Sequence, residues 1–348
     1  LAIQESKGLN AQQITEALNI PILKTDRPSS EYLFEELEEE RAPLFSRKNL
    51  AVKGDIAQVD VAELITLFEH GKTFGSLIRV PKELAEKLPA IAERVEEVLA
   101  YGGMLEQAAA RLVEPLVKQA HHLAQRYDCV VANPPYMGSN GMNAGLKEFA
   151  RHSFPYSKSD LFAMFIERGF DLTTPVGHEA MVTMQSWIFL SSYEAMRKNL
   201  LATKTISTMI QIGYNSFPEI NSKIAQAIAF SAHHCHVNAY KGTYVNLNSA
   251  PQSADKKIVF LHRDLSITHY VVQNDFKKLH GSPIAYWIND KVRQIFVQSR
   301  PIRHIIDARQ GLATADDGRF LRLWHEVSLK KIGFGFASKQ EALISARK

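Results

Sequence analysis

Tyr127-Asp-Cys-Val-Val-Ala-Asn-Pro-Pro-Tyr136 is an apolar, β-branched run that ends abruptly at two prolines. A short run of this kind, bounded by a turn signal, predicts a buried parallel strand over 127–132. In open α/β sheets, ligands gather at the carboxyl ends of the strands, and residues 133–136 follow the predicted strand directly. The sequence therefore predicts a candidate site in this loop.

Strands and helices alternate downstream of this loop. We predict a helix that begins at Ser159 or Asp160 and runs through Phe170, and a second helix over 191–201. Apolar runs predict three further strands, over 179–183, 205–213 and 224–231. Strands separated by helices of about 10–15 residues indicate an α/β sheet with helices on both faces.

The flanking regions have different patterns. Apolar residues spaced three or four apart predict helices through much of residues 1–126. After residue 235 the alternation stops, and two short strands are predicted over 240–246 and 257–262. We therefore divide the chain into a mainly helical insert or linker (1–126), an α/β part (127–235) and a third part (236–348).

The net charge of +4 conceals an uneven distribution. Residues 1–126 carry 15 basic and 20 acidic side chains, whereas residues 233–348 carry 18 basic and 9 acidic ones. In the last region basic residues alternate with aromatic residues, among them Tyr286, Trp287 and Trp324. Binding to nucleic acid needs such a basic excess to neutralise phosphates, and aromatic rings can stack on bases. This region is a candidate nucleic-acid surface, with an ordinary solvated surface as the alternative.

The composition excludes several classes of protein. Hydrophobic residues make up 45% and charged residues 22% of the 348 residues, as in globular rather than disordered proteins. No apolar run approaches the roughly 18–20 residues that span a bilayer, so we expect no membrane association. Cys129 and Cys235 are the only cysteines, which excludes a disulfide framework and favours a reducing, cytoplasmic setting.

The tetrapeptide Asn133-Pro134-Pro135-Tyr136 combines groups suited to holding an amino group. The two prolines fix φ near about −65° and stiffen the turn. The side-chain oxygen of Asn133 and the carbonyl of Pro134 can then accept both hydrogens of one amine, whose lone pair is left facing an electrophile. The ring of Tyr136 offers a face for a stacked base, a contact worth about 1–3 kcal/mol. A base inside a duplex cannot reach such a pocket, so this chemistry implies base flipping. The alternative is a structural strand-to-helix turn.

The run Val-Val-Ala-Asn-Pro-Pro-Tyr resembles the catalytic motif of the adenine-N6 DNA methyltransferases, and Asn133–Asn143 is similar to the PglX-type enzymes of BREX phage-defence systems. Gly213–Pro218 resembles the family segment whose aromatic residue stacks on the flipped base. The resemblance implies that Asn133, Pro134, Pro135 and Tyr136 are catalytic, and that the adenine lies between Tyr136 and Phe217.

The same resemblance implies an architecture and a set of partners. The fold would be α/β, with a partial Rossmann-like methyltransferase sheet, a helical N-terminal segment and, over 236–348, the start of an α+β target-recognition domain. The methyl donor would be S-adenosylmethionine, and no metal would be needed. The partners would be double-stranded DNA and other phage-defence proteins.

One feature that this family leads us to expect is missing. These enzymes hold S-adenosylmethionine through a glycine-rich turn after the first strand, where the backbone approaches the methionine part closely. No such turn precedes residue 127, and Gly102-Gly103 lies between predicted helices. Residue 1 is Leu rather than Met. We therefore expect a segment of a longer enzyme whose cofactor-binding residues are unknown, and which by itself binds S-adenosylmethionine poorly and does not methylate DNA.

Two other functions stay open. A methyltransferase fold that has lost catalysis would serve as a DNA-binding or docking subunit, and the missing glycine-rich turn favours this alternative. An enzyme could also methylate another planar amine, such as cytosine N4 or a protein glutamine. Cytosine-N4 enzymes more often carry Ser in place of the residue that corresponds to Asn133.

Two further features have competing interpretations. His233-His234-Cys235-His236 contains three metal-ligating residue types, but neighbours in a strand point to opposite faces, so at most two could reach one ion. We interpret this run as the end of a strand, without a metal. Trp187 follows the strand predicted over 179–183 and is either a core residue or the wall of a pocket.

Overall fold

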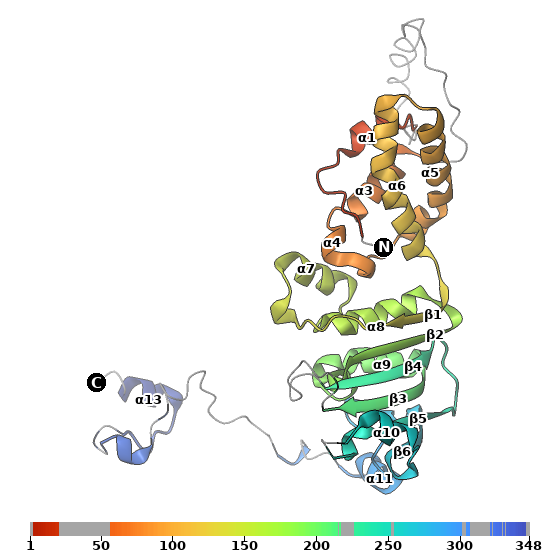
Figure 1. The fold of residues 1–348 in the computed structure, drawn as a ribbon. Helices are drawn as coiled ribbons and strands as arrows, with labels where there is room; N and C mark the ends of the chain where they lie inside the picture. The colour runs from red at the N-terminus through yellow and green to blue at the C-terminus, as the bar shows by residue number, and fades with distance from the viewer. Residues whose placement is uncertain are drawn as a thin grey trace, which may run out of the picture. The chain divides into compact units, whose positions relative to one another are not determined.

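The computed structural model describes residues 3–20, 56–214, 216, 226–251, 254–300, 304–306, 321, 323–328, 330 and 332–345. The chain divides into two compact units, Leu1–Val297 and Gln298–Lys348. The first unit contains a helical part and a six-stranded sheet (Figure 1). The second contains helix α13 (Lys339–Ser345). No helix in the described ranges combines the length and the apolar character needed to span a bilayer.

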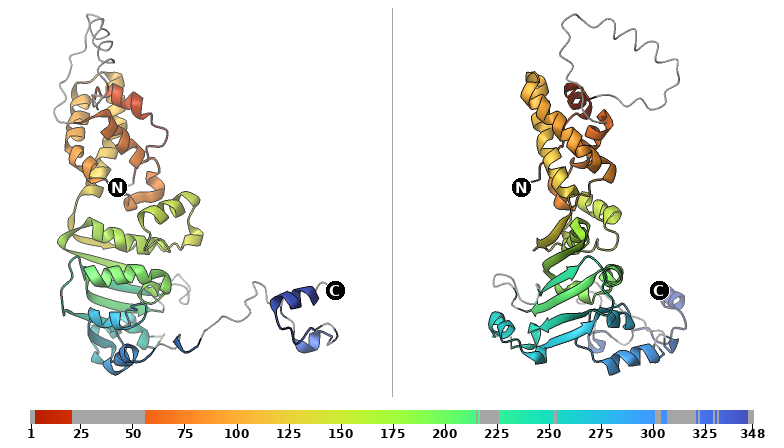
Figure 2. Two further views of the ribbon diagram at one scale, coloured as in Figure 1. Left: turned by 180° about the vertical axis from the view of Figure 1, so that it is seen from behind. Right: turned by 90° about the vertical axis from the view of Figure 1, so that its right-hand side faces the viewer.

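Helices make up the regular structure described before residue 127. They are α1 (Ala11–Ala17), α3 (Gln58–Leu67), α4 (Gly71–Phe74), α5 (Lys82–Tyr101) and α6 (Met104–Ala124). The two long helices α5 and α6 are separated by Gly102 and Gly103 and lie side by side (Figure 2). Their apolar positions enter one core, in which Ile91 and Val113 are completely buried. Tertiary packing of these apolar faces supplies most of the stability of such helices.

The sheet contains six strands in the order β1-β2-β4-β3-β5-β6. Their bounds are β1 (Tyr127–Ala132), β2 (Thr173–Met184), β3 (Thr205–Gly213), β4 (Ala227–His233), β5 (Lys241–Asn246) and β6 (Thr268–Val272). β1 runs parallel to β2, and β3 runs parallel to β5, whereas β4 is antiparallel to both of its neighbours. β1 and β3 have the bounds that the sequence predicts.

The two faces of the sheet are covered unequally. Helices α8 (Leu161–Leu172) and α9 (Glu194–Thr203) share a core with side chains of one face, including Met181, Met209 and Phe230. The side chains that alternate with these along β2 and β4 are partly exposed. In the described ranges, helices therefore pack against one face, and the prediction of helices on both faces is not met there.

β1 lies at the edge of the sheet, where β2 is its neighbour. The sequence predicts a buried strand here, but Cys129 is exposed and Val131 is 75% exposed. The prediction of burial is wrong because both side chains point to the face of the sheet that no described helix covers. The second edge of β1 pairs with no described strand, and unpaired edges of this kind are sites at which proteins add another strand.

One prediction for the region after residue 235 is wrong. Residues 257–262 were expected to form a strand, but they lie largely in helix α10 (Lys256–Leu261). Asp255 caps this helix, because its carboxylate accepts hydrogen bonds from the backbone N–H groups of Lys257 and Ile258. β5 and β6 extend the sheet beyond residue 235, and helix α11 (Asp290–Gln298) follows them.

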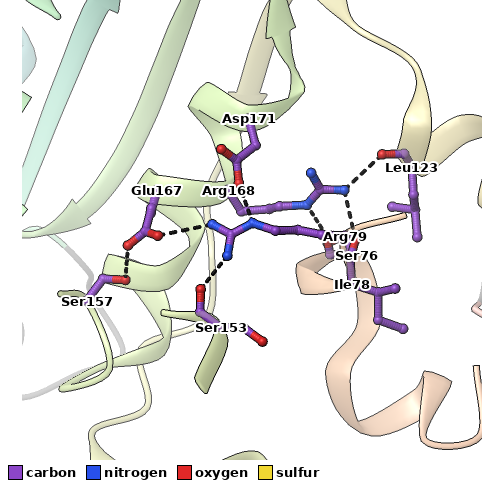
Figure 3. A network of polar contacts seen from close by, with 9 residues as sticks. All are labelled: Ser76, Ile78, Arg79, Leu123, Ser153, Ser157, Glu167, Arg168 and Asp171. Carbon is purple, nitrogen blue, oxygen red and sulfur yellow. Dashed lines mark hydrogen bonds and ion pairs between the residues drawn. The ribbon is translucent and has the colours of Figure 1, made fainter. Parts of the chain in front are cut away.

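Arg168 joins the helical part of the chain to α8 (Figure 3). Its side chain is buried and donates to the backbone carbonyls of Ser76, Ile78 and Leu123 at 2.8–2.9 Å. Burial lowers its pKa to about 10, so the guanidinium remains charged at neutral pH. A buried charge is tolerated only where hydrogen bonds compensate for lost water, and these three carbonyls provide them.

Arg79 makes a second connection to the same helix (Figure 3). Its guanidinium donates to the carboxylates of Asp171 at 2.6 Å and Glu167 at 3.0 Å, and also to the carbonyl of Ser153. Glu167 in addition accepts a hydrogen bond from the hydroxyl of Ser157. The acidic side chains of α8 that face the helical part are therefore already paired.

Glu179 is a carboxyl group in the middle of β2. Its side chain is completely buried, and neither oxygen has a hydrogen-bond partner in the described residues. Burial raises its pKa well above the usual 4.5. Since the pKa in the folded protein exceeds that in the unfolded chain, this group favours folding at low pH and opposes it increasingly as the pH rises above 4.5.

The substitution Glu179→Gln removes this titration. We expect the stability of the wild-type protein relative to the variant to fall between about pH 5 and pH 8, by at most about 1.4 kcal/mol per pH unit. Urea unfolding of both proteins at the two pH values measures the difference. Parallel stability profiles would contradict a protonated Glu179 in the fold.

Candidate active site

The Asn-Pro-Pro-Tyr loop leaves the sheet at the carboxyl end of β1, beside the register pair formed by Ala132 and Met181. Pro134 is buried, whereas Asn133 and Pro135 are exposed. The side chain of Asn133 makes no hydrogen bond to another described residue. The buried proline thus anchors the turn, and the asparagine amide faces solvent with its acceptor oxygen available to a ligand.

The ring of Tyr136 is half-buried and packs against the core. It makes an edge-to-face contact with Phe162, with ring centroids 6.1 Å apart, and its hydroxyl donates to the carbonyl of Val182 at 3.4 Å. Burial raises the pKa of Tyr136, so the phenol stays protonated at neutral pH. The ring is held in a defined position directly after the two prolines.

Asp160 ties the loop to the start of α8. Its carboxylate accepts hydrogen bonds from the backbone N–H of Met137 at 3.0 Å and that of Phe162 at 3.3 Å. The backbone N–H of Leu161 donates in turn to the carbonyl of Met137, and that of Ser139 donates to the carbonyl of Ser159. Of the two capping residues that the sequence predicts, Asp160 is the one that caps. Its bond to the loop is not visible in the sequence.

A chain of buried side-chain hydrogen bonds lies at the same end of the sheet. Gln211 donates to the side-chain oxygen of Gln185 at 2.8 Å and accepts from the hydroxyl of Tyr286 at 2.6 Å. Gln185 also donates to Gln226, just before β4. The sequence analysis does not identify these residues, although each glutamine lies in or close to an apolar run: Gln185 just after 179–183, Gln211 within 205–213 and Gln226 within 224–231. The network fixes the strand ends that border the loop.

Of the other residues that the sequence predicts to be functional, the structure describes Trp187 but not Phe217. Trp187 is fully buried, donates to the hydroxyl of Thr183 at 3.0 Å and contacts Phe230 edge-on, so it is a core residue. Phe217 lies outside the described residues, and so do most of residues 307–322 and the side chain of Trp324. The stacking role of Phe217 and the DNA-binding role of that basic region remain predictions.

The histidine run follows the strand geometry that the sequence predicts. His233 faces His178 on the neighbouring strand, with ring centroids 4.0 Å apart. His234 points to the other side and contacts Phe170 edge-on, at 6.0 Å. In the part of the chain that the structure describes, no three His, Cys, Asp or Glu side chains gather in a way that could hold a metal ion.

Comparison with known proteins identifies a family that matches part of this chain. The Eco57I restriction-modification methylase family matches residues 45–217, which include the Asn-Pro-Pro-Tyr loop. Among solved structures, a putative class I S-adenosylmethionine-dependent methyltransferase from Listeria monocytogenes is 13% identical, with 73% of this chain and 88% of that chain covered at a TM-score of 0.31.

Curated relatives are much more similar in sequence. The adenine-specific methyltransferase BrxX of Escherichia coli O9:H4 (strain HS) is 42% identical over 285 residues, or 79% of this chain and 23% of BrxX. The adenine-specific methyltransferase PglX of Lacticaseibacillus casei (strain Zhang) is 34% identical over 284 residues, or 79% of this chain and 24% of PglX. The chain thus spans about a quarter of the length of these relatives. At this level of identity it belongs to the PglX-type adenine-specific methyltransferases, the family that its Asn-Pro-Pro-Tyr loop resembles.

Proposed function

We propose that this chain supplies the adenine-binding part of a DNA adenine-N6 methyltransferase that marks DNA in phage defence. The observation that carries the proposal is the exposed Asn133 amide, which projects from a stiff loop at the carboxyl end of β1 with no partner among the described residues. A polar group held ready in this way suits the positioning of a substrate amine. The identity to BrxX and PglX over 79% of the chain supports the choice of adenine.

In this proposed mechanism the chain holds a flipped adenine. The side-chain oxygen of Asn133 and the carbonyl of Pro134 accept the two hydrogens of N6, so the nitrogen lone pair points away from both acceptors. Tyr136 stacks on one face of the base, and Phe217 stacks on the other. No strong base is required, because the proton leaves N6 after methylation has made it cationic. S-adenosylmethionine, when bound, supplies the electrophilic methyl group.

The described residues do not fit S-adenosylmethionine by themselves. None of their parallel strands is followed by a turn with several glycines that would let the backbone approach the methionine part. We propose instead that a further strand pairs with the bare edge of β1 in the active enzyme and brings this turn with it. The position of β1 at the end of the strand order, with its second edge paired to no described strand, supports this arrangement.

The function can be tested in two proteins. The isolated chain is expected to bind S-adenosylmethionine weakly and to transfer no methyl group; micromolar affinity in calorimetry would contradict this. A chimera in which the chain replaces the 285 aligned residues of E. coli BrxX is expected to form N6-methyladenine in plasmid DNA, measured by mass spectrometry of nucleosides. Formation of N4-methylcytosine instead would indicate that the chain positions the N4 amine of cytosine. A folded chimera that binds duplex DNA without methylating it would favour the DNA-binding subunit.

The contact between Asp160 and the loop gives a separate prediction. Asp160→Ala removes the acceptor for the N–H of Met137 and the cap of α8, so we expect a loss of about 1 kcal/mol in stability. Methyl transfer by the chimera should fall by about 10- to 100-fold, because the loop loses its anchor. Asp160→Asn keeps an acceptor oxygen and is expected to retain most of the stability and most of the methylation rate. An alanine variant as active as the wild type would contradict the anchoring role.

A further inference from the structure

A pocket of about 400 Å³ lies between α8 and α9, beside the ends of the strands that point away from the Asn-Pro-Pro-Tyr loop. Its lining includes Arg126, just before β1, Lys204, just before β3, and His234, just after the antiparallel β4. Buried apolar side chains of the two helices also line it, among them Phe170 and Leu200. Ligand pockets in proteins typically have this size and combine apolar walls with a few polar groups.

The two cations of this pocket form no ion pair in the part of the chain that the structure describes. Neither the Arg126 nor the Lys204 side chain forms an ion pair or a hydrogen bond in the described residues. Lys204 is partly buried, with its ammonium 5.0 Å from the centre of the Phe170 ring. Most surface lysines and arginines are solvated freely, but a partly buried ammonium over an aromatic ring has given up water and gains from a counter-ion.

The acids that line the pocket form their ion pairs with another residue. Glu167 and Asp171 line the pocket but accept hydrogen bonds from Arg79 at 3.0 and 2.6 Å (Figure 3). Burial lowers the pKa of Lys204, and Asp171 and Glu179 both lie close enough to raise it, but neither forms an ion pair with it in the described residues. The N–H groups of Arg126 and Lys204 are therefore accepted by no carboxylate of the described residues.

His234 adds an unused polar atom. Its ring nitrogen Nδ1 is buried and has no hydrogen-bond partner in the described residues. Burial lowers the pKa of His234 and the charges of Lys204 and Arg126 lower it further, whereas a hydrogen bond to the backbone of Thr173 and the charge of Asp171 raise it. An anion beside these side chains would provide an acceptor for the N–H groups of Arg126 and Lys204.

We propose that this pocket binds a small organic anion, whose carboxylate or phosphate lies among Arg126, Lys204 and His234 and whose apolar body packs against Phe170 and Leu200. The site is separate from the adenine-binding loop, because its residues stand at the other ends of the strands. It adds a ligand-binding activity that does not depend on methyl transfer.

Calorimetry on the full 348-residue chain tests the proposal with simple probes. Phenyl phosphate and benzoate carry the anion on an apolar body, inorganic phosphate lacks the body, and benzyl alcohol lacks the charge. We expect phenyl phosphate or benzoate to bind at least 10-fold more tightly than inorganic phosphate and benzyl alcohol. Whichever of phenyl phosphate and benzoate binds more tightly identifies the preferred anionic group. Equal binding of inorganic phosphate would indicate an adventitious ion only and overturn the proposal.

Two lysine variants locate the site. Lys204→Gln is expected to weaken binding of the preferred probe by about 10-fold, the effect of about 1.4 kcal/mol. Lys198→Gln is the matched control in α9, the helix that ends just before Lys204. Lys198 pairs with Glu194 at 2.6 Å and does not line the pocket, so this substitution should change binding by less than 2-fold. Unchanged affinity in Lys204→Gln would overturn the proposal. So would displacement of the probe by duplex DNA, which would assign these cations to backbone phosphates.

Discussion

Asn133→Ala is expected to remove nearly all adenine methylation from the BrxX chimera that carries this chain, with a loss of at least about 100-fold in rate. The variant lacks the oxygen that accepts one N6 hydrogen, so the amine is no longer fixed with its lone pair toward the methyl donor. Single-turnover methylation of a duplex at saturating S-adenosylmethionine measures the effect on the chemical step.

The same substitution should leave the fold and duplex binding intact. Asn133 is exposed and makes no hydrogen bond to another described residue, so its removal breaks no contact that holds the loop. Asn140→Ala is a matched control, because Asn140 is an exposed asparagine of the same loop region. It should methylate at the wild-type rate. Retained turnover in Asn133→Ala would refute the assigned role.

Arg168→Met is expected to cost about 3–5 kcal/mol of unfolding free energy, the largest effect on stability that we anticipate. Methionine fills a similar volume, but it cannot donate to the three carbonyls that Arg168 satisfies at 2.8–2.9 Å. These buried carbonyls would then lack a partner. Urea unfolding followed by circular dichroism at neutral pH measures the change.

Arg151→Met provides the comparison for this variant. Arg151 is an exposed arginine of α7 (Ala144–Ser153), and no ion pair or side-chain hydrogen bond involves it in the described residues. Its replacement should change stability by no more than about 0.5 kcal/mol. Equal stabilities of the two variants would show that the carbonyls find water or other donors when Arg168 is absent.

Local sequence patterns account for much of the sheet but not for its edges. The strands over 127–132 and 205–213 were predicted at their observed bounds, because β-branched runs between turn signals specify them locally. The exposure of Val131 was not predictable, since it depends on whether a helix covers that face of the sheet. Residues 257–262 were misassigned because the capping carboxylate of Asp255 outweighs the strand preference of a short apolar run.

The candidate site was predictable to a similar extent. The position of Asn133 after a strand follows from the sequence, and so does the cap at Asp160. The bond from Asp160 to the loop, the glutamine chain at Gln185 and the three carbonyls around Arg168 join residues far apart in sequence. No periodicity or spacing reports such contacts, because they arise only when the chain has folded.

Helix α8 connects the helical part of the chain to the Asn-Pro-Pro-Tyr loop. Twelve residues long, it extends about 18 Å as one rigid rod. Asp160 at its first end holds the loop that carries Asn133, and Arg168 toward its other end is held by the carbonyls of Ser76, Ile78 and Leu123. The helical part and the Asn-Pro-Pro-Tyr loop are therefore attached to the same rigid helix, so residues before 127 help to fix the position of this loop.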